Sequence, residues 1–453
     1  MRGCDHQGLR PVNWVDTELL HTDAMVRLRI GPIVMDGRGL HDAVLARQRE
    51  LGAFGIDESS SVILRASPGP ALIIDLLALM RSESQVMLLD HRLTENVVNN
   101  VGWRVGATHE ITTVTSLPPT CGYVLTESEI HPLAAGSRRS DDAILQVSSG
   151  TTAEPKIIRR SVAEIAAETA RYRAFPGVIG PGESIIVASS IVHTWGLFGG
   201  VLLGLAQQSE VVLPDRQTAI GLQQAIAAGT RGATLLGVPL HVAMLRKTPA
   251  PQQLRAVFSA GAPLDLAAAQ PWEHVQVGQT YGMTEVGVIA ADLLGQYEGR
   301  TQLAPDLRAR MIETGELLLG LGRSPYLDPA ADRWENGWFE TRDAVAGLED
   351  DRLVRLLGRL DGLTSLGGRK VHTSEIEAHL KQTGVVEDAV VFVRDATVEA
   401  FVTLATPNTD IDAISRALPE YMRPHRTTVL DELPRTLTGK TLRRRDAYEY
   451  KHG

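Results

Sequence analysis

The sequence has little cysteine and no long apolar run. Only Cys4 and Cys121 occur among 453 residues, so a disulfide framework or a cysteine-rich zinc site is excluded. The thirteen histidines form no HExxH or HxxxH pair on an expected helix, so no histidine-based metal site is indicated. No stretch approaches about 20 uncharged apolar residues, and no basic segment followed by an apolar one opens the chain. We therefore expect no membrane partner and a cytoplasmic location.

The sequence also lacks an excess of positive charge. It has 45 Lys and Arg against 54 Asp and Glu, which gives a formal charge of −9. General nucleic-acid binders depend on cationic surfaces, so we expect no nucleic-acid partner. The composition is otherwise that of a globular protein, with 43% hydrophobic and 22% charged residues. Its length favours about two or three domains, and the composition says nothing of the oligomeric state.

Short apolar runs alternate with helix-compatible segments through roughly the first 310 residues. Examples are 61–66 (SVILRA), 184–189 (SIIVAS) and 233–237 (ATLLG), each ending near Gly, Pro or Asp. Strands interleaved with helices predict an α/β sheet with crossover connections. After about residue 312 the short strand-like runs 316–319 and 338–341 surround turn residues and predict a small antiparallel β unit.

The last part of the sequence predicts an α+β domain of its own. We expect a helix over 374–382 with Ser374 as its N-cap, followed by strands at 385–393 and 398–405. The predicted division is therefore a large N-terminal α/β domain, residues 1–359, and a small C-terminal α+β domain, residues 360–453.

A loop rich in glycine and hydroxyl residues follows the strand-like run 144–147. Residues 146–156 read QVSSGTTAEPK. Small residues let backbone N–H groups converge on an anion, hydroxyls add donors, and Lys156 adds a compact positive charge, which suits a di- or triphosphate. The GxxxxGK[ST] pattern of a Walker A loop is absent. On residue types alone, a polar surface turn with a solvated lysine is the alternative.

The segment SSGTTAEPK resembles the phosphate loop of the acyl-adenylate-forming superfamily. That family contains acyl- and aryl-CoA synthetases, nonribosomal adenylation domains and firefly-type luciferases. Ala153 and Ile157 stand where the family usually has glycine, and both can stiffen the loop. The resemblance implies that ATP phosphates are bound by Ser149, Gly150, Thr151, Thr152 and Lys156.

Two further segments resemble the family's adenine and α-phosphate elements. Residues 259–264 (SAGAPL) are similar to the segment that lines the adenine, which implies roles for Gly261, Ala262 and Pro263. Residues 281–285 (YGMTE) are similar to the YGxTE element. This implies that Tyr281 and Gly282 meet the nucleotide, that the Thr284 hydroxyl meets the α-phosphate, and that Glu285 binds Mg²⁺, which prefers oxygen ligands. Taken alone, each string is also an ordinary turn.

Residues 338–345 and 358–361 resemble the ribose-binding and hinge elements. In 338–345 (WFETRDAV) Arg342 replaces the usual glycine, while Asp343 keeps the carboxylate that accepts hydrogen bonds from ribose hydroxyls. In 358–361 (GRLD) the resemblance implies that Arg359 binds ribose or phosphate and that Asp361 is the hinge between domains. Short strings of this kind are common, and the alternative for Asp343 is an ordinary hairpin aspartate.

The C-terminal motifs complete the order that the family shows. In 365–377 (SLGGRKVHTSEIE) the glycines implied to line the thiol arm are Gly367 and Gly368. Residues 433–443 (LPRTLTGKTLR) place Lys440 at the family's catalytic lysine. A cation is needed there because a carboxylate attacking a phosphate brings two anions together. The alternative is one more surface lysine beside the basic run 443–445.

The predicted acyl site lies in residues 190–197 (SIVHTWGL). The resemblance implies that His193 lies between the acyl pocket and the thiol tunnel, with Trp195, Gly261 and Thr280 as pocket walls. In the family that the chain resembles, enzymes that activate α-amino acids generally carry an Asp near the position of Thr194, which pairs with the substrate ammonium. Here no acidic residue occurs between 185 and 208, and an unpaired ammonium would cost several kcal/mol. We therefore expect a carboxylic acid without an α-amino group.

The resemblance implies an AMP-forming acid–thiol ligase that uses ATP, Mg²⁺ and CoA. Its catalytic residues would be Lys440, Thr284, Glu285 and His193, and the small domain would be mobile. One alternative is a ligase that loads the phosphopantetheine arm of an acyl carrier protein. Another is a non-catalytic nucleotide-binding homologue, which the departures at Ala153, Ile157 and Arg342 favour. A luciferase-like oxidation has no supporting residue.

Overall fold

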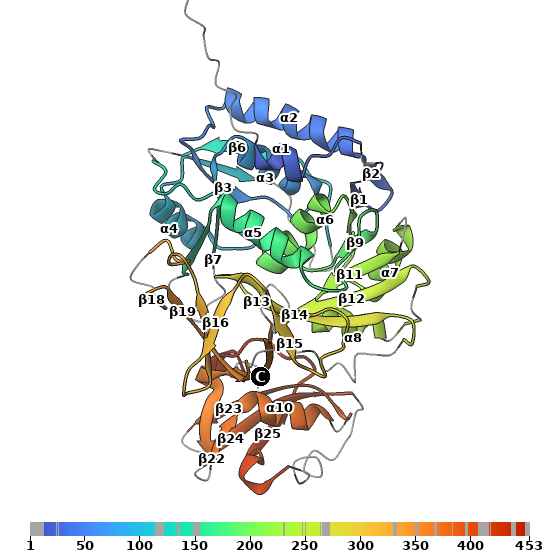
Figure 1. The fold of residues 1–453 in the computed structure, drawn as a ribbon, viewed down its shortest axis with the longest axis vertical. Coiled ribbons are helices and arrows are strands. Elements are labelled where there is room, and N and C mark those ends of the chain that lie inside the picture. The colour runs from blue at the N-terminus through green and yellow to red at the C-terminus, as the bar shows by residue number, and fades with distance from the viewer. Residues whose placement is uncertain are drawn as a thin grey trace, which may run out of the picture. The chain divides into compact units, whose positions relative to one another are not determined.

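The computed structural model describes most of the chain and divides it into two compact units. The described residues are 13–23, 25, 27–113, 122–133, 136–147, 155–229, 232–246, 248–249, 251–262, 264, 272–328, 333–348, 352–366, 369–382, 384–394, 397–405, 416, 418–435 and 441–448. The first unit comprises 1–296 and 325–331, and the second comprises 297–324 and 332–453. Figure 1 shows the elements of both.

The first unit contains a six-stranded sheet with a parallel centre. The strands, in spatial order, are β6 (Glu129–Pro132), β5 (His109–Thr112), β3 (Ser61–Arg65), β4 (Gln85–Leu88), β7 (Ile144–Val147) and β8 (Ile157–Arg160). Pairs β5–β3, β3–β4 and β4–β7 are parallel, and both edge strands are antiparallel. Strands β3, β4 and β7 are almost wholly buried, as expected for parallel strands whose sheet is covered on both faces.

A second run of strands in the first unit is also mainly parallel. Its order is β14 (Gly287–Asp292), β13 (Gln276–Met283), β12 (Leu254–Ala260), β11 (Ala233–Gly237), β9 (Ser184–Val187), β10 (Glu210–Leu213), β1 (Leu28–Ile30) and β2 (Ile33–Met35). Only β13–β14 and β1–β2 are antiparallel. Leu222 and Val242 from two helices pack against Leu235 and Val257 of this sheet, which forms one core of the unit.

The helices of the first unit are α1 (Trp14–Glu18), α2 (Gly37–Ala53), α3 (Pro70–Arg81), α4 (Glu95–Val105), α5 (Val162–Arg173), the π-helix η1 (Trp195–Leu202), α6 (Leu203–Ala206), α7 (Ala219–Ala228) and α8 (Pro239–Arg246). Helices α3, α4, α7 and α8 and the segment η1–α6 each join two parallel strands of one sheet as a crossover connection. Helix α5 starts at a capping box in which Ser161 and Glu164 exchange hydrogen bonds. Among the described residues no helix has both the length and the hydropathy needed to span a bilayer.

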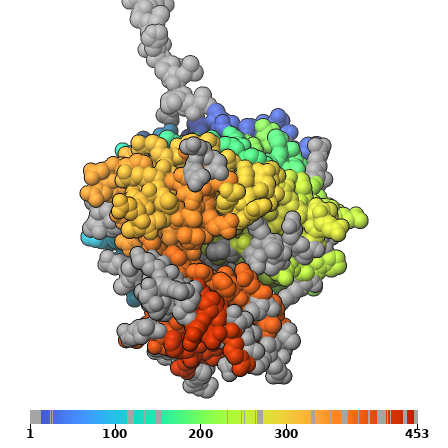
Figure 2. Space-filling model, turned by 60° about the horizontal axis from the view of Figure 1, so that its bottom comes forward, coloured from blue at the N-terminus to red at the C-terminus, as the bar shows by residue number. Residues whose placement is uncertain are grey.

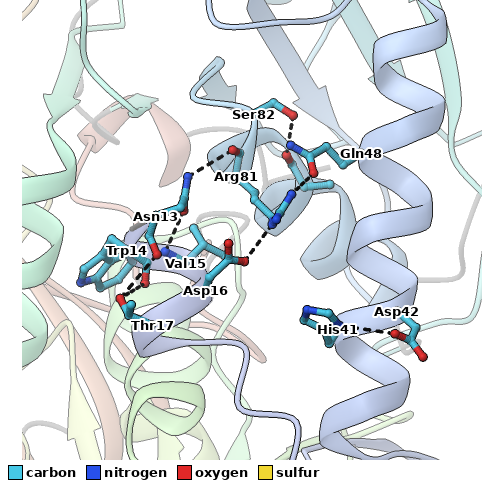
Figure 3. A network of polar contacts seen from close by, with 11 residues as sticks. Asn13, Trp14, Val15, Asp16, Thr17, His41, Asp42, Gln48, Arg81 and Ser82 are labelled. Atoms are coloured by element: carbon cyan, nitrogen blue, oxygen red, sulfur yellow. Dashed lines mark hydrogen bonds and ion pairs between the residues drawn. The ribbon is translucent and has the colours of Figure 1, made fainter. Parts of the chain in front are cut away.

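The N-terminal helix is tied to α2 and α3 by polar contacts (Figure 3). The Asn13 side chain caps α1 by accepting from Val15 N, and its amide donates to the Arg81 carbonyl at 3.1 Å. The Arg81 guanidinium bonds Asp16 at 2.8 Å and also contacts Gln48 of α2. One arginine at the end of α3 therefore fixes three helices of the first unit.

The second unit is antiparallel around one sheet and α+β at its C-terminal end. The strands of the first sheet, in spatial order, are β16 (Arg308–Met311), β17 (Glu316–Gly320), β19 (Trp338–Gly347), β20 (Leu353–Arg359) and β15 (Thr301–Leu303), with β18 (Trp334–Glu335) paired to β19. A hairpin follows, made of β21 (Leu363–Leu366) and β22 (Arg369–His372). The last sheet contains β23 (Val386–Arg394), β24 (Thr397–Leu404) and β25 (Arg426–Val429). The predicted antiparallel unit is present, although it begins at Thr301 rather than near residue 312.

Helix α10 (Thr373–Gln382) packs its apolar side on the three-stranded sheet, whose surface is orange to red in Figure 2. The described residues of this unit also form the short 3₁₀ turns η3 (Leu360–Gly362), η4 (Glu420–Met422) and η5 (Arg445–Tyr448). The predicted cap at Ser374 is wrong, because the helix already begins at Thr373. The Ser374 hydroxyl instead donates to the Leu357 carbonyl at 3.0 Å. The predicted boundary between residues 359 and 360 lies inside the second unit. It stays a prediction, because a domain that rotates need not coincide with a compact unit.

A buried histidine on α8 makes the first unit sensitive to acid. His241 Nδ1 accepts a hydrogen bond from Val238 N at 3.1 Å, and burial lowers the pKa of its imidazole from 6.5 to about 4. Between these pH values the unfolded chain binds a proton that the folded chain does not. The neutral His241 therefore contributes fully to the free energy of unfolding above pH 6.5. This contribution is lost as the pH falls toward 4, by roughly 1.4 kcal/mol per pH unit.

We expect His241→Gln to remove this dependence. Lowering the pH from 7.5 to 5.5 should cost the wild type about 1.4 kcal/mol more free energy of unfolding than it costs the variant. Urea unfolding at both pH values measures this difference. His131→Gln, at a half-exposed side chain, is the control and should behave as the wild type does. An equal acid loss in wild type and His241→Gln would contradict the prediction.

Candidate nucleotide and acyl site

The β7–β8 hairpin of the first unit carries the predicted phosphate loop. Its strands pair in register from Ile144 with Arg160 to Val147 with Ile157. Ser149, Gly150, Thr151 and Thr152 lie outside the described residues. Lys156, at the start of β8, is described and half-buried, and its ammonium lies 5.1 Å from the centre of the Tyr326 ring.

Gln146 joins the phosphate-loop strand to the segment that carries His193. The Gln146 side chain is 2% exposed. Its amide nitrogen donates to the Val192 carbonyl at 3.0 Å, and its oxygen accepts from the Thr194 hydroxyl at 3.2 Å. The predicted acyl segment is therefore fixed beside the strand from which the predicted phosphate loop departs. It continues directly into the π-helix η1, a form that is frequent at functional sites.

His193 faces a buried carboxylate that the sequence reasoning missed. His193 Nε2 lies 4.0 Å from Asp90 Oδ2, and Arg92 donates to both Asp90 oxygens at 2.7 and 2.9 Å. Burial raises the pKa of Asp90, but the hydrogen bonds and charge of Arg92 outweigh it, so that pKa lies below its ordinary value. A signal was available, because Asp90 follows β4 at the carboxyl edge of the parallel strands, next to β7.

Asp90 bears on the prediction that the acid has no α-amino group. That prediction rested on the lack of an acidic residue in 185–208, whereas Asp90 reaches the His193 segment from elsewhere in the chain. Both oxygens of Asp90 are held by Arg92. A substrate ammonium would have to compete with a bidentate guanidinium, so the expectation stands.

The turn that carries Thr284 and Glu285 rests on buried charges. Arg160 Nη2 donates to the Thr284 carbonyl at 2.6 Å, and Arg160 Nη1 lies 3.4 Å from the Glu168 carboxylate. That carboxylate accepts from Val288 N at 3.1 Å. A Cβ on Gly287, whose φ is +83°, would lie 2.2 Å from the same carboxylate, so the charged pair can approach the turn only because residue 287 is glycine.

Tyr326 contacts the predicted metal ligand. Its ring is 1% exposed, and its hydroxyl donates to Glu285 Oε1 at 3.0 Å. The segment around Tyr326 runs antiparallel to β8, with bonds from Arg159 N to the Pro325 carbonyl and from Leu327 N to the Ile157 carbonyl, both 2.9 Å. No spacing in the sequence indicated this contact, because it joins two segments that no motif connects.

The predicted adenine elements lie at the ends of neighbouring strands. Gly261 and Ala262 follow β12 in an exposed bend, while Tyr281 and Gly282 end β13. The two strands are parallel and pair Ala260 with Thr280, so these segments meet at one edge of the sheet. The Tyr281 side chain is 9% exposed. Pro263 lies outside the described residues.

Two of the predicted pocket residues line one small apolar cavity. Trp195 and Thr280 form part of its wall, together with Tyr172, Phe258 and Leu236. The Trp195 indole donates to the Gly237 carbonyl at 2.9 Å, which fixes the ring against β11. His193 and Gly261 are not among the lining residues. An acyl group that enters this cavity needs Trp195 or η1 to shift, because the cavity is small.

The second unit brings the predicted ribose residues together. Asp343 and Arg359 are register partners across β19 and β20, with Nη1 and Oδ1 3.3 Å apart. Arg342 has φ +57°, a glycine-like conformation, and its N–H donates to Glu316 Oε1 at 2.8 Å. Arg342, which stands where the family usually has glycine, therefore keeps the backbone conformation that glycine adopts readily. Asp361 lies in η3, while Gly367, Gly368 and Lys440 lie outside the described residues.

The residues present suit magnesium bound together with a nucleotide. Within the described ranges no three His, Cys, Asp or Glu side chains gather as a metal cluster. Glu285 offers one carboxylate at the expected position. Mg²⁺ is commonly held by one or two carboxylates plus substrate phosphates and water, so Glu285 fits that mode of binding.

The comparison with family models identifies one family over more than half of the chain. Residues 38–316 match the family model described as AMP-binding enzyme. The chain belongs to the AMP-binding enzyme family. This confirms the membership that the ordered motifs predicted. The family model ends before the predicted ribose, hinge and Lys440 elements, so those roles rest on the motifs.

Several named relatives of the family are similar to this chain. 4-Coumarate–CoA ligase-like 8 of Arabidopsis thaliana is 28% identical over 68% of this chain and 62% of its own length. 3,4-Dihydroxybenzoate–aryl-carrier protein ligase of Bacillus anthracis is 25% identical over 67% and 73%. 2-Succinylbenzoate–CoA ligase of a Geobacillus species is 25% identical over 90% and 93%. The match thus spans less than two thirds of the first of these proteins.

The fold agrees with that of a solved protein structure. The O-succinylbenzoate coenzyme A synthetase of Bacillus subtilis, in complex with ATP and magnesium ion, superposes with a TM-score of 0.78 and 18% identity. The match covers 95% of this chain and 98% of that one. The predicted fold class, a large α/β part with a smaller α+β part, is confirmed.

Proposed function

We propose that the chain is an AMP-forming acid–thiol ligase that converts a carboxylic acid to an acyl-adenylate and then to a thioester. The observation that carries the proposal is the grouping around Tyr326, whose ring faces the Lys156 ammonium and whose hydroxyl donates to the Glu285 carboxylate. A cation for phosphate and a carboxylate for a metal are what a bound Mg²⁺–ATP requires. The named relatives are ligases of this type.

In the first half-reaction a carboxylate oxygen of the acid attacks the α-phosphorus of ATP, and the bond to pyrophosphate breaks. Lys156 and the loop hydroxyls would hold the β- and γ-phosphates, and Glu285 would hold Mg²⁺, which neutralises phosphate charge when bound. Asp343 and Arg359 would bind the ribose, and Lys440 would meet the developing charge. Positioning and charge neutralisation account for catalysis without a protein nucleophile.

In the second half-reaction a thiol loses its proton to water and its sulfur attacks the acyl carbonyl. The bond from the carbonyl carbon to the phosphate oxygen breaks, and AMP leaves with the bonding electrons. His193 lies at the acyl segment, and Asp90 beside it stabilises a positive imidazole. If the small domain turns about Asp361, it would withdraw Lys440 and present Gly367 and Gly368 to the thiol arm. One site then serves both reactions.

The proposed substrate is an aromatic carboxylic acid without an α-amino group. The cavity beside Trp195 is walled by Tyr172, Phe258 and aliphatic side chains, and aromatic rings pack well against such walls. The names of two relatives specify 3,4-dihydroxybenzoate and 2-succinylbenzoate, and a third is named for its likeness to a 4-coumarate–CoA ligase. CoA is the proposed thiol. A carrier-protein arm is the second candidate, which the aryl-carrier protein ligase supports.

Acid-dependent exchange of pyrophosphate into ATP tests the proposal. The purified chain with Mg²⁺ should exchange pyrophosphate with one or more members of a panel of aryl, heteroaryl and fatty acids, and an aryl acid should be preferred to its α-amino counterpart. Adding CoA or a pantetheinylated carrier protein then identifies the acceptor. ATP binding without exchange for any acid would instead support the non-catalytic homologue.

A further inference from the structure

Tyr326 contacts both charged side chains predicted to meet the Mg²⁺–pyrophosphate part of the nucleotide. Its hydroxyl donates to Glu285 Oε1 at 3.0 Å, and the Lys156 ammonium lies 5.1 Å from its ring centre. A hydroxyl bonded to a carboxylate restricts the rotation of that carboxylate. A cation within about 6 Å of an aromatic ring centre is attracted to the ring.

The ring itself has a fixed position. Tyr326 is 1% exposed, and its backbone pairs with Ile158 in an isolated bridge, with flanking hydrogen bonds to both neighbours of Ile158. The strand to which it is bound, β8, is the one that Lys156 precedes. Tyr326 is therefore anchored to the phosphate-loop hairpin and reaches from there to the turn after β13.

The turn is held from a second side. Arg160, also on β8, donates to the Thr284 carbonyl at 2.6 Å, which fixes the backbone of the turn. Because that contact is made to the backbone, it does not orient the side chain of Glu285. The Tyr326 hydroxyl supplies a contact at the carboxylate itself, so backbone and side chain of the predicted metal ligand are each tied to the same hairpin.

We propose that Tyr326 is a positioning residue that holds the Glu285 carboxylate and the Lys156 ammonium in the arrangement that Mg²⁺-bound ATP requires. The inference rests on the proposed function. Tyr326 touches neither the acid nor the reacting phosphorus in this account. It acts through Glu285 and Lys156.

Calorimetric binding of ATP with Mg²⁺ and with EDTA separates positioning from a merely structural role. Wild type should bind ATP more tightly with Mg²⁺ than without. Tyr326→Phe keeps the ring and removes only the hydroxyl, so it should weaken binding in Mg²⁺ roughly three- to tenfold and leave binding in EDTA unchanged. Tyr326→Leu also removes the ring and should weaken binding in EDTA as well, because Lys156 loses its support.

A double-mutant cycle makes the contact itself testable. In a Glu285→Gln background, Tyr326→Phe should have no further effect on Mg²⁺-dependent binding. Tyr297→Phe is the matched control, since it removes a tyrosine hydroxyl that donates to the Gln302 side chain at 3.2 Å in the second unit. It should bind ATP as the wild type does.

Two results would overturn the inference and leave the proposed function standing. In the first, wild type exchanges pyrophosphate, but Tyr326→Phe gains as much ATP affinity from Mg²⁺ as wild type does. The positioning role is then wrong and the proposed function stands. If Tyr326→Phe weakens binding equally with Mg²⁺ and with EDTA, the hydroxyl has only a structural role. A wild type that binds no ATP would overturn the inference together with the function.

Discussion

Lys440→Ala is expected to abolish acid-dependent ATP–pyrophosphate exchange while largely sparing thioester formation from preformed acyl-adenylate. The loss should be about 10²- to 10³-fold, because the lysine neutralises charge that develops when two anions meet. Thiol attack on the adenylate involves no such meeting, so it needs the lysine less. The two half-reactions are measured separately, with radiolabelled pyrophosphate and with synthetic acyl-adenylate plus CoA.

Arg444→Ala is the matched control for Lys440. Its side chain is half-exposed beside Asp446 in the same basic segment, so a general loss of positive charge in the tail would affect both variants. Arg444→Ala should retain exchange. Equal loss of both half-reactions in Lys440→Ala would contradict the separation of roles.

Glu168→Ala is expected to destabilise the first unit by roughly 3–5 kcal/mol and to remove exchange activity. Glu168 is 1% exposed, and its loss leaves the buried Arg160 guanidinium without its carboxylate and Val288 N without its acceptor. Breaking a buried pair on one side costs this much because the remaining charge is uncompensated. The turn carrying Thr284 and Glu285 loses the same support, which links stability to activity.

Urea unfolding and exchange assays measure the two effects of Glu168→Ala. Glu50→Ala on α2 removes a carboxylate whose side chain is 53% exposed and pairs with Arg47. It should cost less than about 1 kcal/mol and leave exchange intact. A change of similar size in both variants would show that the Arg160–Glu168 pair is not the support of the turn.

The strands were predictable because apolar runs between turn residues have a direct physical cause. The run 233–237 matches β11 exactly in extent, and 61–66 differs from β3 by one residue. The failure of the predicted cap at Ser374 was not foreseeable from local sequence, since its hydroxyl donates to the Leu357 carbonyl of strand β20. At Ser374 a partner that is distant in the sequence therefore outweighed the local preference for an N-cap.

The site was predictable where motifs follow strands and unpredictable where single residues arrive from elsewhere. Ordered motifs predicted a phosphate loop, a turn at Glu285 and a pair of Asp343 and Arg359. Residues 149–152 of that loop lie outside the described residues, and the nucleotide-binding roles of all three elements stay predictions. Tyr326 and Glu168 gave no signal, because their roles depend on contacts with Glu285 and with Val288 across the fold. Asp90 could have been found from its place at the end of a buried parallel strand.

The central claim is that the chain makes a mixed anhydride of a carboxylic acid and AMP. The most direct measurement incubates it with ATP, Mg²⁺ and an accepted aryl acid without any thiol, and analyses the products by mass spectrometry. The account predicts acyl-adenylate and pyrophosphate in equal amounts, close to one of each per protein chain. Formation of ADP and phosphate, or no consumption of ATP with any acid of the panel, would contradict it.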